Sequence, residues 1–273
     1  MKKAVLFIVY SNILISFCAG MLAYGTASFQ SLLSPVRYFW FIFGATLFVY
    51  NAQRLLRLQE LNDSLSSRHQ WIIQNKKTVL LISFGGLAIS IFWFIRAFFD
   101  VRNILFFGFF GIISMFYSFS ITTRLPSLRE LPFVKIHLIA LTWTASCVFF
   151  PLLNKEGLNQ ADWGLIFAVY LYFVAITIPF DIRDLPYDKE KQKTIPQVLG
   201  KRNAVVLACL LTLFSLFISV FFHLRLMTSP FFYLAYSYQF ILILLALKKR
   251  TELFYSGGID GGIILLGLGL SFL

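Results

Sequence analysis

Long apolar runs separated by short polar stretches set the pattern of this chain. A helix needs about 20 apolar residues to cross the hydrocarbon core of a bilayer, and the sequence predicts nine such helices. They lie near residues 4–24, 36–56, 78–98, 101–121, 133–153, 163–181, 203–224, 229–247 and 257–273. The strands of a membrane β-barrel would alternate polar and apolar residues over about ten positions, whereas these runs are apolar on every side. The pattern therefore predicts one all-α transmembrane domain over residues 1–273.

Composition leads to the same class of protein. Hydrophobic residues make up 59% of the chain, charged residues 13%, and the mean hydropathy is +0.78. These values lie far outside the range of soluble globular domains. The first apolar run follows Lys2 and Lys3 but is too long for a cleaved signal peptide, so we expect it to be retained. We expect a multi-pass protein of the lipid bilayer, located in a bacterial inner (cytoplasmic) membrane.

The basic residues predict how the helices are oriented. If the N-terminus is cytoplasmic, all but five of the 24 lysines and arginines fall on the cytoplasmic side, as the positive-inside rule requires. The five on the outer side are Arg37, Arg96, Arg102, Lys155 and Arg225. Nine spans then place the C-terminus outside. Topology and attraction to anionic lipid account for the net charge of +12, so no nucleic-acid partner is implied.

The stretch 181–200, DIRDLPYDKEKQKTIPQVLG, concentrates polar chemistry in an otherwise apolar chain. Asp181, Asp184 and Asp188 have the spacing that places three carboxylates on one face of a helix, and carboxylates hold hard divalent cations. Basic residues that could hold phosphate lie beside them. These are Arg183, Lys189, Lys191, Lys193 and Lys201. The combination suits a metal-bound diphosphate, although a solvated loop whose charges mark the water side would give the same spacing.

Two prolines modify this picture. Pro179 and Pro186 each lack a backbone N–H and disfavour a continuous helix. We therefore expect Asp181 and Asp184 at the end of one helix. We expect Asp188 in the first turn of another helix that begins at Pro186.

A second cluster of polar residues lies at the end of the second predicted helix. Asn51, Arg54 and Arg57 are spaced one helical turn apart, so an amide and two guanidinium groups project from one side of the helix end. Polar groups at membrane depth usually face a cavity. The two arginines could instead extend to the lipid headgroups, but the short Asn51 side chain cannot reach them.

These residues resemble the UbiA superfamily of membrane prenyltransferases. The tail after the three aspartates matches the T-x-P-x-x-L-G pattern of the second aspartate-rich motif in that family. Its residues are Thr194, Pro196, Leu199 and Gly200. The first motif begins correctly at Asn51, but its acidic places are Ala52, Leu55 and Gln59. Arg68 could stand for the basic residue later in that loop, where His69 takes the place of the usual proline.

The resemblance implies nine helices around a central cavity beneath two cytoplasmic loops. It also implies Mg²⁺-dependent transfer of a prenyl group from a prenyl diphosphate to a hydrophobic or aromatic acceptor within the membrane. Metal and basic groups stabilise the anionic leaving group in such chemistry, and aromatic rings can stabilise the allylic cation. The 33 phenylalanines would suffice to line the chamber.

We expect a one-metal site because three acids of the first motif are missing. The three aspartates of residues 181–188 would hold Mg²⁺ and form the catalytic centre. The expected substrate-binding residues are Asn51, Arg54, Arg57, Arg68, Lys189 and Lys193. Asp260 precedes the last apolar run, and we expect it to be a first-turn charge of that helix, with a cavity-facing group as the alternative.

Two other classes of function stay open. A catalytically degenerate member would bind an isoprenoid lipid or a partner without releasing pyrophosphate, which would explain the lost acids. A small transporter would also fit nine helices, but transporters place polar, broken helices near the middle of the membrane. Here the polar groups gather at one face.

Overall fold

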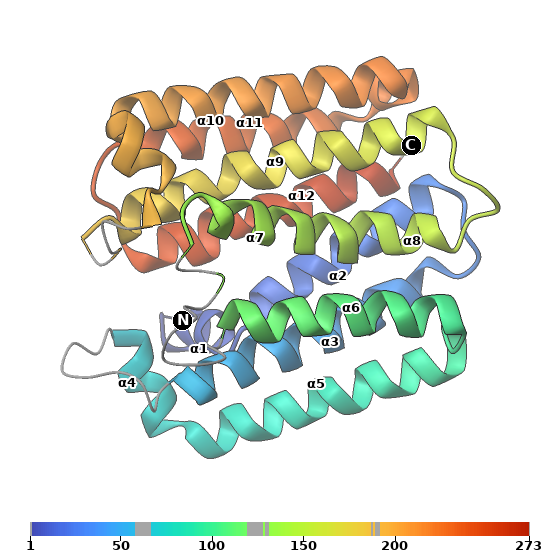
Figure 1. The fold of residues 1–273 in the computed structure, drawn as a ribbon, viewed down its shortest axis with the longest axis horizontal. Coiled ribbons are helices and arrows are strands. Elements are labelled where there is room, and N and C mark those ends of the chain that lie inside the picture. Colours follow the sequence, from blue (N-terminus) through green and yellow to red (C-terminus); the bar gives the residue numbers. More distant parts are fainter. Residues whose placement is uncertain are drawn as a thin grey trace.

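The computed structural model describes residues 2–57, 67–118, 128, 131–186, 188 and 192–272. All regular structure in these residues is helical. Its elements are α1 (Lys2–Tyr10), α2 (Ile13–Phe29), α3 (Pro35–Arg57), α4 (Ser67–Gln74), α5 (Lys76–Ala97), α6 (Val101–Ser118), α7 (Val134–Thr144), η2 (Ala145–Phe149), α8 (Phe150–Leu153), α9 (Gln160–Asp184), α10 (Ile195–Phe222), η4 (Leu224–Thr228), α11 (Pro230–Leu245), η5 (Phe254–Ile259) and α12 (Asp260–Ser271). The long helices lie side by side, and the two chain termini lie toward opposite ends of the bundle (Figure 1).

Each of the nine predicted apolar runs is mostly helical where the structure describes it. Five helical segments are long and apolar enough to cross a membrane, and α1 with α2 makes a sixth if that bent pair is one span. The helices α6 and α11 are shorter apolar helices. The chain is therefore an integral membrane protein with an all-helical fold. The full count of nine crossings stays a prediction.

The first predicted helix is broken. The axes of α1 and α2 meet at an angle of 62°, and Asn12 at the break has a left-handed backbone with φ of 63°. Asparagine tolerates this conformation better than most residues because its short polar side chain can bond locally. One continuous helix over residues 4–24 was the wrong prediction for this segment.

The central helix is α9. In its apolar stretch of 18 residues, 78% of the residues are buried, whereas 17% are buried in that of α5. It packs on α7 and α10, while α2 packs on α3 and α12. A capping box between Asn159 and Asp162 starts α9. The helix continues through Pro179 and ends at Asp184, as expected for the two aspartates.

The predicted helix beginning at Pro186 is absent from the described residues. Residues 185–186 form a turn, and the next α-helix begins at Ile195. The Thr194 backbone N–H donates to the Gln197 side-chain oxygen at 2.8 Å, and Pro196 occupies the first turn. A capped start with proline in its first turn stabilises a helix more than a proline alone, so α10 begins here.

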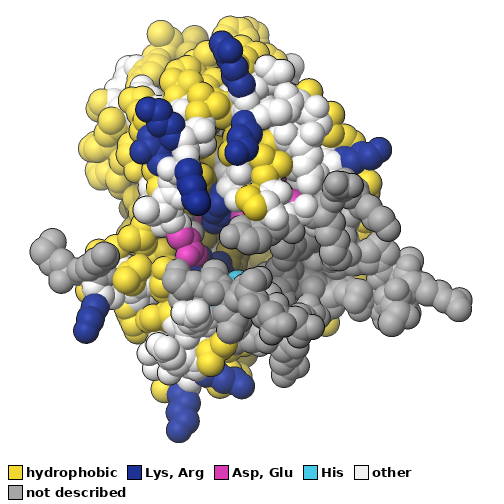
Figure 2. All heavy atoms as spheres, turned by 90° about the vertical axis from the view of Figure 1, so that its left-hand side faces the viewer, with side chains coloured by type: hydrophobic (Ala, Val, Ile, Leu, Met, Phe, Trp, Pro, Cys, Tyr) yellow, Lys and Arg dark blue, Asp and Glu magenta, His cyan; other side chains and the backbone are white. Residues whose placement is uncertain are grey.

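The bundle has one end that carries α4, which we call the α4 end. The last residues of α3 and α9 and the first residues of α5, α7 and α10 lie there (Figure 1). Figure 2 views this end: lysine and arginine side chains are spread around it, and acidic side chains lie between them. The two polar groups predicted from the sequence therefore lie at the same end of the molecule.

Candidate functional site

Two of the three predicted metal ligands share one lysine. Lys135 is the second residue of α7, and its Nζ lies 2.8 Å from Asp181 Oδ1 and 3.5 Å from Asp188 Oδ2. Only 10% of the lysine side chain and 1% and 5% of the two carboxylate side chains are exposed. The carboxylates are thus brought together around a buried ammonium group.

A small cavity lies beside this cluster. Its volume is about 10 Å³, and it is lined by Phe133, Lys135, Ile136, Asp181, Gln192, Thr194 and Ile195. That volume suits about one water molecule. The side-chain oxygen of Gln192 is buried and has no hydrogen-bond partner among the described residues. The cavity therefore offers a water a place beside the buried charges.

The third aspartate, Asp184, has a different partner. Arg183 Nε and Nη2 donate to the two oxygens of Asp184 at 2.7 and 3.0 Å. The same guanidinium lies 5.2 and 5.4 Å from the ring centres of Phe180 and Tyr255. Among the described residues, no three His, Cys, Asp or Glu side chains come together as a set of metal ligands. In this arrangement the three aspartates do not form a common site for Mg²⁺.

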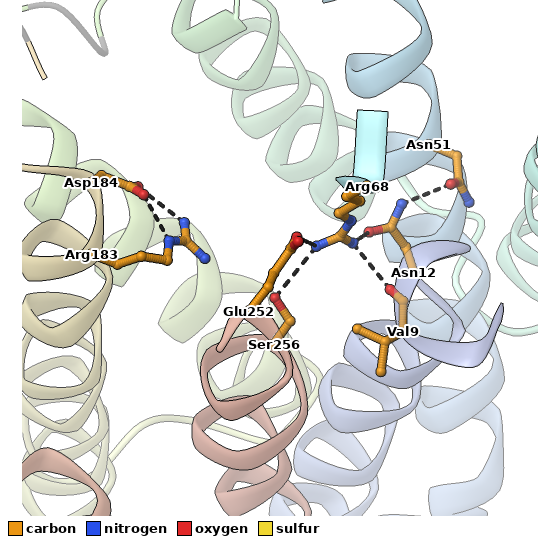
Figure 3. A network of polar contacts seen from close by, with 8 residues as sticks. All are labelled: Val9, Asn12, Asn51, Arg68, Arg183, Asp184, Glu252 and Ser256. Carbon is orange, nitrogen blue, oxygen red and sulfur yellow. Dashed lines mark hydrogen bonds and ion pairs between the residues drawn. The ribbon is translucent and has the colours of Figure 1, made fainter. Parts of the chain in front are cut away.

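Arg68 joins three parts of the chain at the α4 end (Figure 3). From α4, its Nη2 donates to Val9 O at 3.1 Å and to Asn12 Oδ1 at 2.7 Å. Its Nη1 donates to Ser256 Oγ at 3.4 Å and lies 3.7 Å from the Glu252 carboxylate. The side chain is buried, so these contacts fix the guanidinium in place.

Asn51 supports this network through hydrogen bonds to protein groups, and its role in substrate binding stays a prediction. Its Oδ1 accepts from Asn12 Nδ2 at 2.7 Å, and its Nδ2 donates to Ser11 O at 3.0 Å and Leu47 O at 2.9 Å. The last carbonyls of a helix have no partner within the helix. Asn51 and Arg68 therefore satisfy carbonyls freed by the break between α1 and α2, and Asn12 links them.

Arg54 differs from the other arginines here. It makes no hydrogen bond or ion pair with the residues that the structure describes, yet it lies within electrostatic range of Arg68, Arg183 and Glu252. It is surrounded by the bundle and still partly exposed. Arg54 of α3, Arg68 of α4 and Arg183 of α9 thus lie within electrostatic range at the α4 end. Arg68 is paired with Glu252 and Arg183 with Asp184, whereas Arg54 makes no ion pair with the described residues.

Asp260 belongs to the same group, which overturns its expected role. The π-helix η5 leads directly into α12, and Ile259 is helical with φ −62° and ψ −47°. Asp260 is therefore not at a free helix end. It lies inside the bundle within electrostatic range of Arg54, Arg68 and Arg183, and it is partly exposed. The alternative of a cavity-facing group stays a prediction.

Aromatic side chains lie one turn deeper in the bundle. Trp143 Nε1 donates to the Tyr50 hydroxyl at 3.1 Å, and the ring centres of Trp143 and Phe173 are 5.1 Å apart. Tyr50 lies four residues before Arg54 on α3 and within electrostatic range of both Arg54 and Asp260. The arginine cluster therefore adjoins a layer of aromatic rings.

The positive charge at the α4 end comes from arginine and lysine. Burial lowers the pKa of Arg68, and Glu252 and Asp260 oppose this effect, but a guanidinium remains protonated in proteins. Burial, and after it the nearby Arg54, lowers the pKa of His69 from 6.5. The imidazole is then neutral at pH 7 and adds no charge.

The remaining predicted residues contribute less. The side chain of Arg57 and the whole of Lys189 lie outside the described residues. Lys193 is exposed and has a left-handed backbone with φ of 44°. The sequence assigned no site role to Lys135 or Asn12, and it named Arg183 only as a basic residue that could hold phosphate. Asn12 carried one usable signal, since it is a polar residue within an apolar run.

Comparison of the chain with protein-family models, curated proteins and solved structures found no match. The resemblance to the UbiA superfamily therefore stays a prediction.

Proposed function

We propose that this chain binds a prenyl diphosphate at its α4 end and transfers the prenyl group to a hydrophobic or aromatic acceptor in the membrane. The observation that carries the proposal is the convergence of Arg54, Arg68 and Arg183 from three helices, with Arg54 making no ion pair among the described residues. Guanidinium groups bind phosphate oxygens bidentately. An isoprenoid chain attached to that phosphate would enter the apolar bundle.

The proposed chemistry follows from these charges. Breaking the allylic C–O bond leaves both bonding electrons on the diphosphate and a carbocation on the prenyl group. The three arginines oppose the negative charge as it develops. The ring faces of Tyr50, Trp143 and Phe173 offer stabilisation to the cation, and the apolar bundle excludes water that would capture it. The acceptor forms the new bond and loses a proton.

The proposal takes no step through a metal. The resemblance implies Mg²⁺ at Asp181, Asp184 and Asp188, but two of these carboxylates contact Lys135 and the third contacts Arg183. Chemical stabilisation of the leaving group is therefore assigned to the arginines. The experiment below measures the rate of transfer both with and without Mg²⁺.

A second candidate is binding of a prenyl diphosphate without transfer. It is favoured by Ala52 and Leu55, which stand on α3 where the resemblance expects acids. Loss of these acids removes oxygen ligands for a second cation.

The test uses purified protein in lipid nanodiscs with farnesyl and geranylgeranyl diphosphate and a panel of aromatic and polycyclic acceptors. Pyrophosphate release and prenylated product are measured with EDTA or with Mg²⁺. Transfer is expected for the wild type, reduced at least tenfold in Arg54→Gln and retained in Arg96→Gln, an exposed arginine at the other end of α5. Binding without pyrophosphate release would select the second candidate. Neither binding nor release by the wild type would refute both.

A further inference from the structure

We propose that Lys135 is a built-in cation that occupies the position between Asp181 and Asp188 where a divalent metal would otherwise bind. The ammonium contacts both carboxylates, at 2.8 and 3.5 Å. One consequence of this inference is that diphosphate binding at the arginines needs no divalent metal. Only that consequence rests on the proposed function.

Burial makes a cation at this position necessary. Asp181 lies in the last turn of α9 with 1% of its side chain exposed, and Asp188 has 5% exposed. Two neighbouring carboxylates repel each other, and an uncompensated buried charge strongly disfavours folding. One ammonium that contacts both reduces that cost without any external ion.

The backbone holds Lys135 in this place. Phe133, two residues earlier, has a left-handed backbone with φ of 60°, and its N–H donates to Gln192 O at 3.2 Å. This bond ties the start of α7 to the segment before α10. Lys135 therefore enters the cluster from a fixed position next to the end of α9.

The space beside the cluster is too small for a hydrated divalent ion in addition to the lysine. The cavity volume is about 10 Å³, which suits one water, whereas Mg²⁺ requires near-octahedral geometry and usually keeps several waters. A metal could occupy the site only if the ammonium left it. Asp184, the third possible ligand, accepts hydrogen bonds from Nε and Nη2 of Arg183.

The substitution Lys135→Met removes the ammonium and keeps a long side chain. We expect it to lower the melting temperature and to create a divalent-cation site at Asp181 and Asp188. The probe is Mn²⁺ alone, detected by its electron paramagnetic resonance signal, together with melting temperatures in Mn²⁺ and in EDTA. The wild type should bind no Mn²⁺ at this site and melt alike in both, whereas the variant should bind one Mn²⁺ and regain melting temperature.

A matched control is available at the opposite end of the bundle. Lys155 Nζ lies 3.0 and 2.8 Å from the two oxygens of a single carboxylate, Asp162. Lys155→Met should also lower the melting temperature, but Mn²⁺ should not restore it. The double variant Lys135→Met/Asp181→Asn should lose the Mn²⁺ response.

Two results would overturn the inference. One is Mn²⁺ binding by the wild type that Asp181→Asn abolishes, which can be measured even if Lys135→Met does not fold. The other is a folded Lys135→Met protein that binds no more Mn²⁺ than Lys155→Met and whose melting temperature Mn²⁺ raises no further. Because these measurements use no prenyl lipid, their outcome is independent of the proposed function. If the protein behaves as predicted in the Mn²⁺ measurements but does not bind prenyl diphosphate, only the proposed function is refuted.

Discussion

The helix break at Asn12 gives a quantitative prediction through Asn51→Ala. The substitution removes two tertiary hydrogen bonds, one from Asn12 Nδ2 at 2.7 Å and one to Ser11 O at 3.0 Å. Interhelical hydrogen bonds in membrane proteins contribute about 0.6 kcal/mol on average and up to about 1.7. Leaving the buried Nδ2 donor of Asn12 without its acceptor adds about 1–3 kcal/mol. The expected loss in free energy of unfolding is therefore about 2–4 kcal/mol.

Reversible unfolding in mixed micelles, followed by tryptophan fluorescence as the denaturing detergent fraction rises, measures this loss. The matched control is Gln53→Ala, two residues away on α3, whose amide donates to Ser114 Oγ at 2.8 Å from a partly buried position. We expect that control to lose about 1 kcal/mol or less. A loss below about 0.5 kcal/mol for Asn51→Ala would show that Asn51 does not hold the break, and the structural role assigned to it would be wrong.

Three further predictions concern single residues. Arg54→Gln should not lower the free energy of unfolding in the same assay, because it removes an enclosed charge without removing a hydrogen bond to the described residues; a loss above about 1 kcal/mol would contradict this. Gly25→Ala should lose about 1–3 kcal/mol because the added Cβ would overlap the Gly267 carbonyl, whereas Gly108→Ala, with open space, should be nearly neutral. Burial lowers the pKa of His223 from 6.5, so the unfolded chain binds the proton more readily. The contribution of His223 to stability should then be full above about pH 6.5 and fall as the pH drops toward the folded pKa. His223→Gln should flatten that dependence. Identical pH profiles for the wild type and His223→Gln would refute this prediction.

The apolar helices were predictable because each follows from a strong local pattern. Runs of about 20 apolar residues leave few alternatives to a helix in a bilayer, and each of the nine runs is mostly helical in the described residues. The end of α9 at Asp184 agrees with the prediction made from Pro179 and Pro186.

The failures came where tertiary contacts decided the backbone. The break at Asn12 is stabilised by Asn51 and Arg68, which lie 39 and 56 residues away in the chain. A pattern confined to residues 4–24 contains no information about those partners. The start of α10 has a local cause, because the Thr194–Gln197 capping box with Pro196 in the first turn is a stronger start signal than Pro186 alone.

The candidate site was partly predictable. Sequence spacing placed Asn51, Arg54 and the three aspartates at one end of the bundle, and the structure agrees with that placement. Spacing could not show which charge each aspartate faces. Lys135 lies 46 residues before Asp181, and only packing of α7 against α9 brings them together.

Binding of farnesyl diphosphate to the wild-type protein in nanodiscs, compared with Arg54→Gln and Arg96→Gln, tests the arginine cluster most directly. Farnesol serves as the ligand that lacks the diphosphate. We predict that the wild type and Arg96→Gln bind farnesyl diphosphate in EDTA, that Arg54→Gln binds at least tenfold more weakly, and that farnesol affinity is the same in all three. Equal farnesyl diphosphate affinity in the wild type and Arg54→Gln would contradict the assignment of the diphosphate site to these arginines.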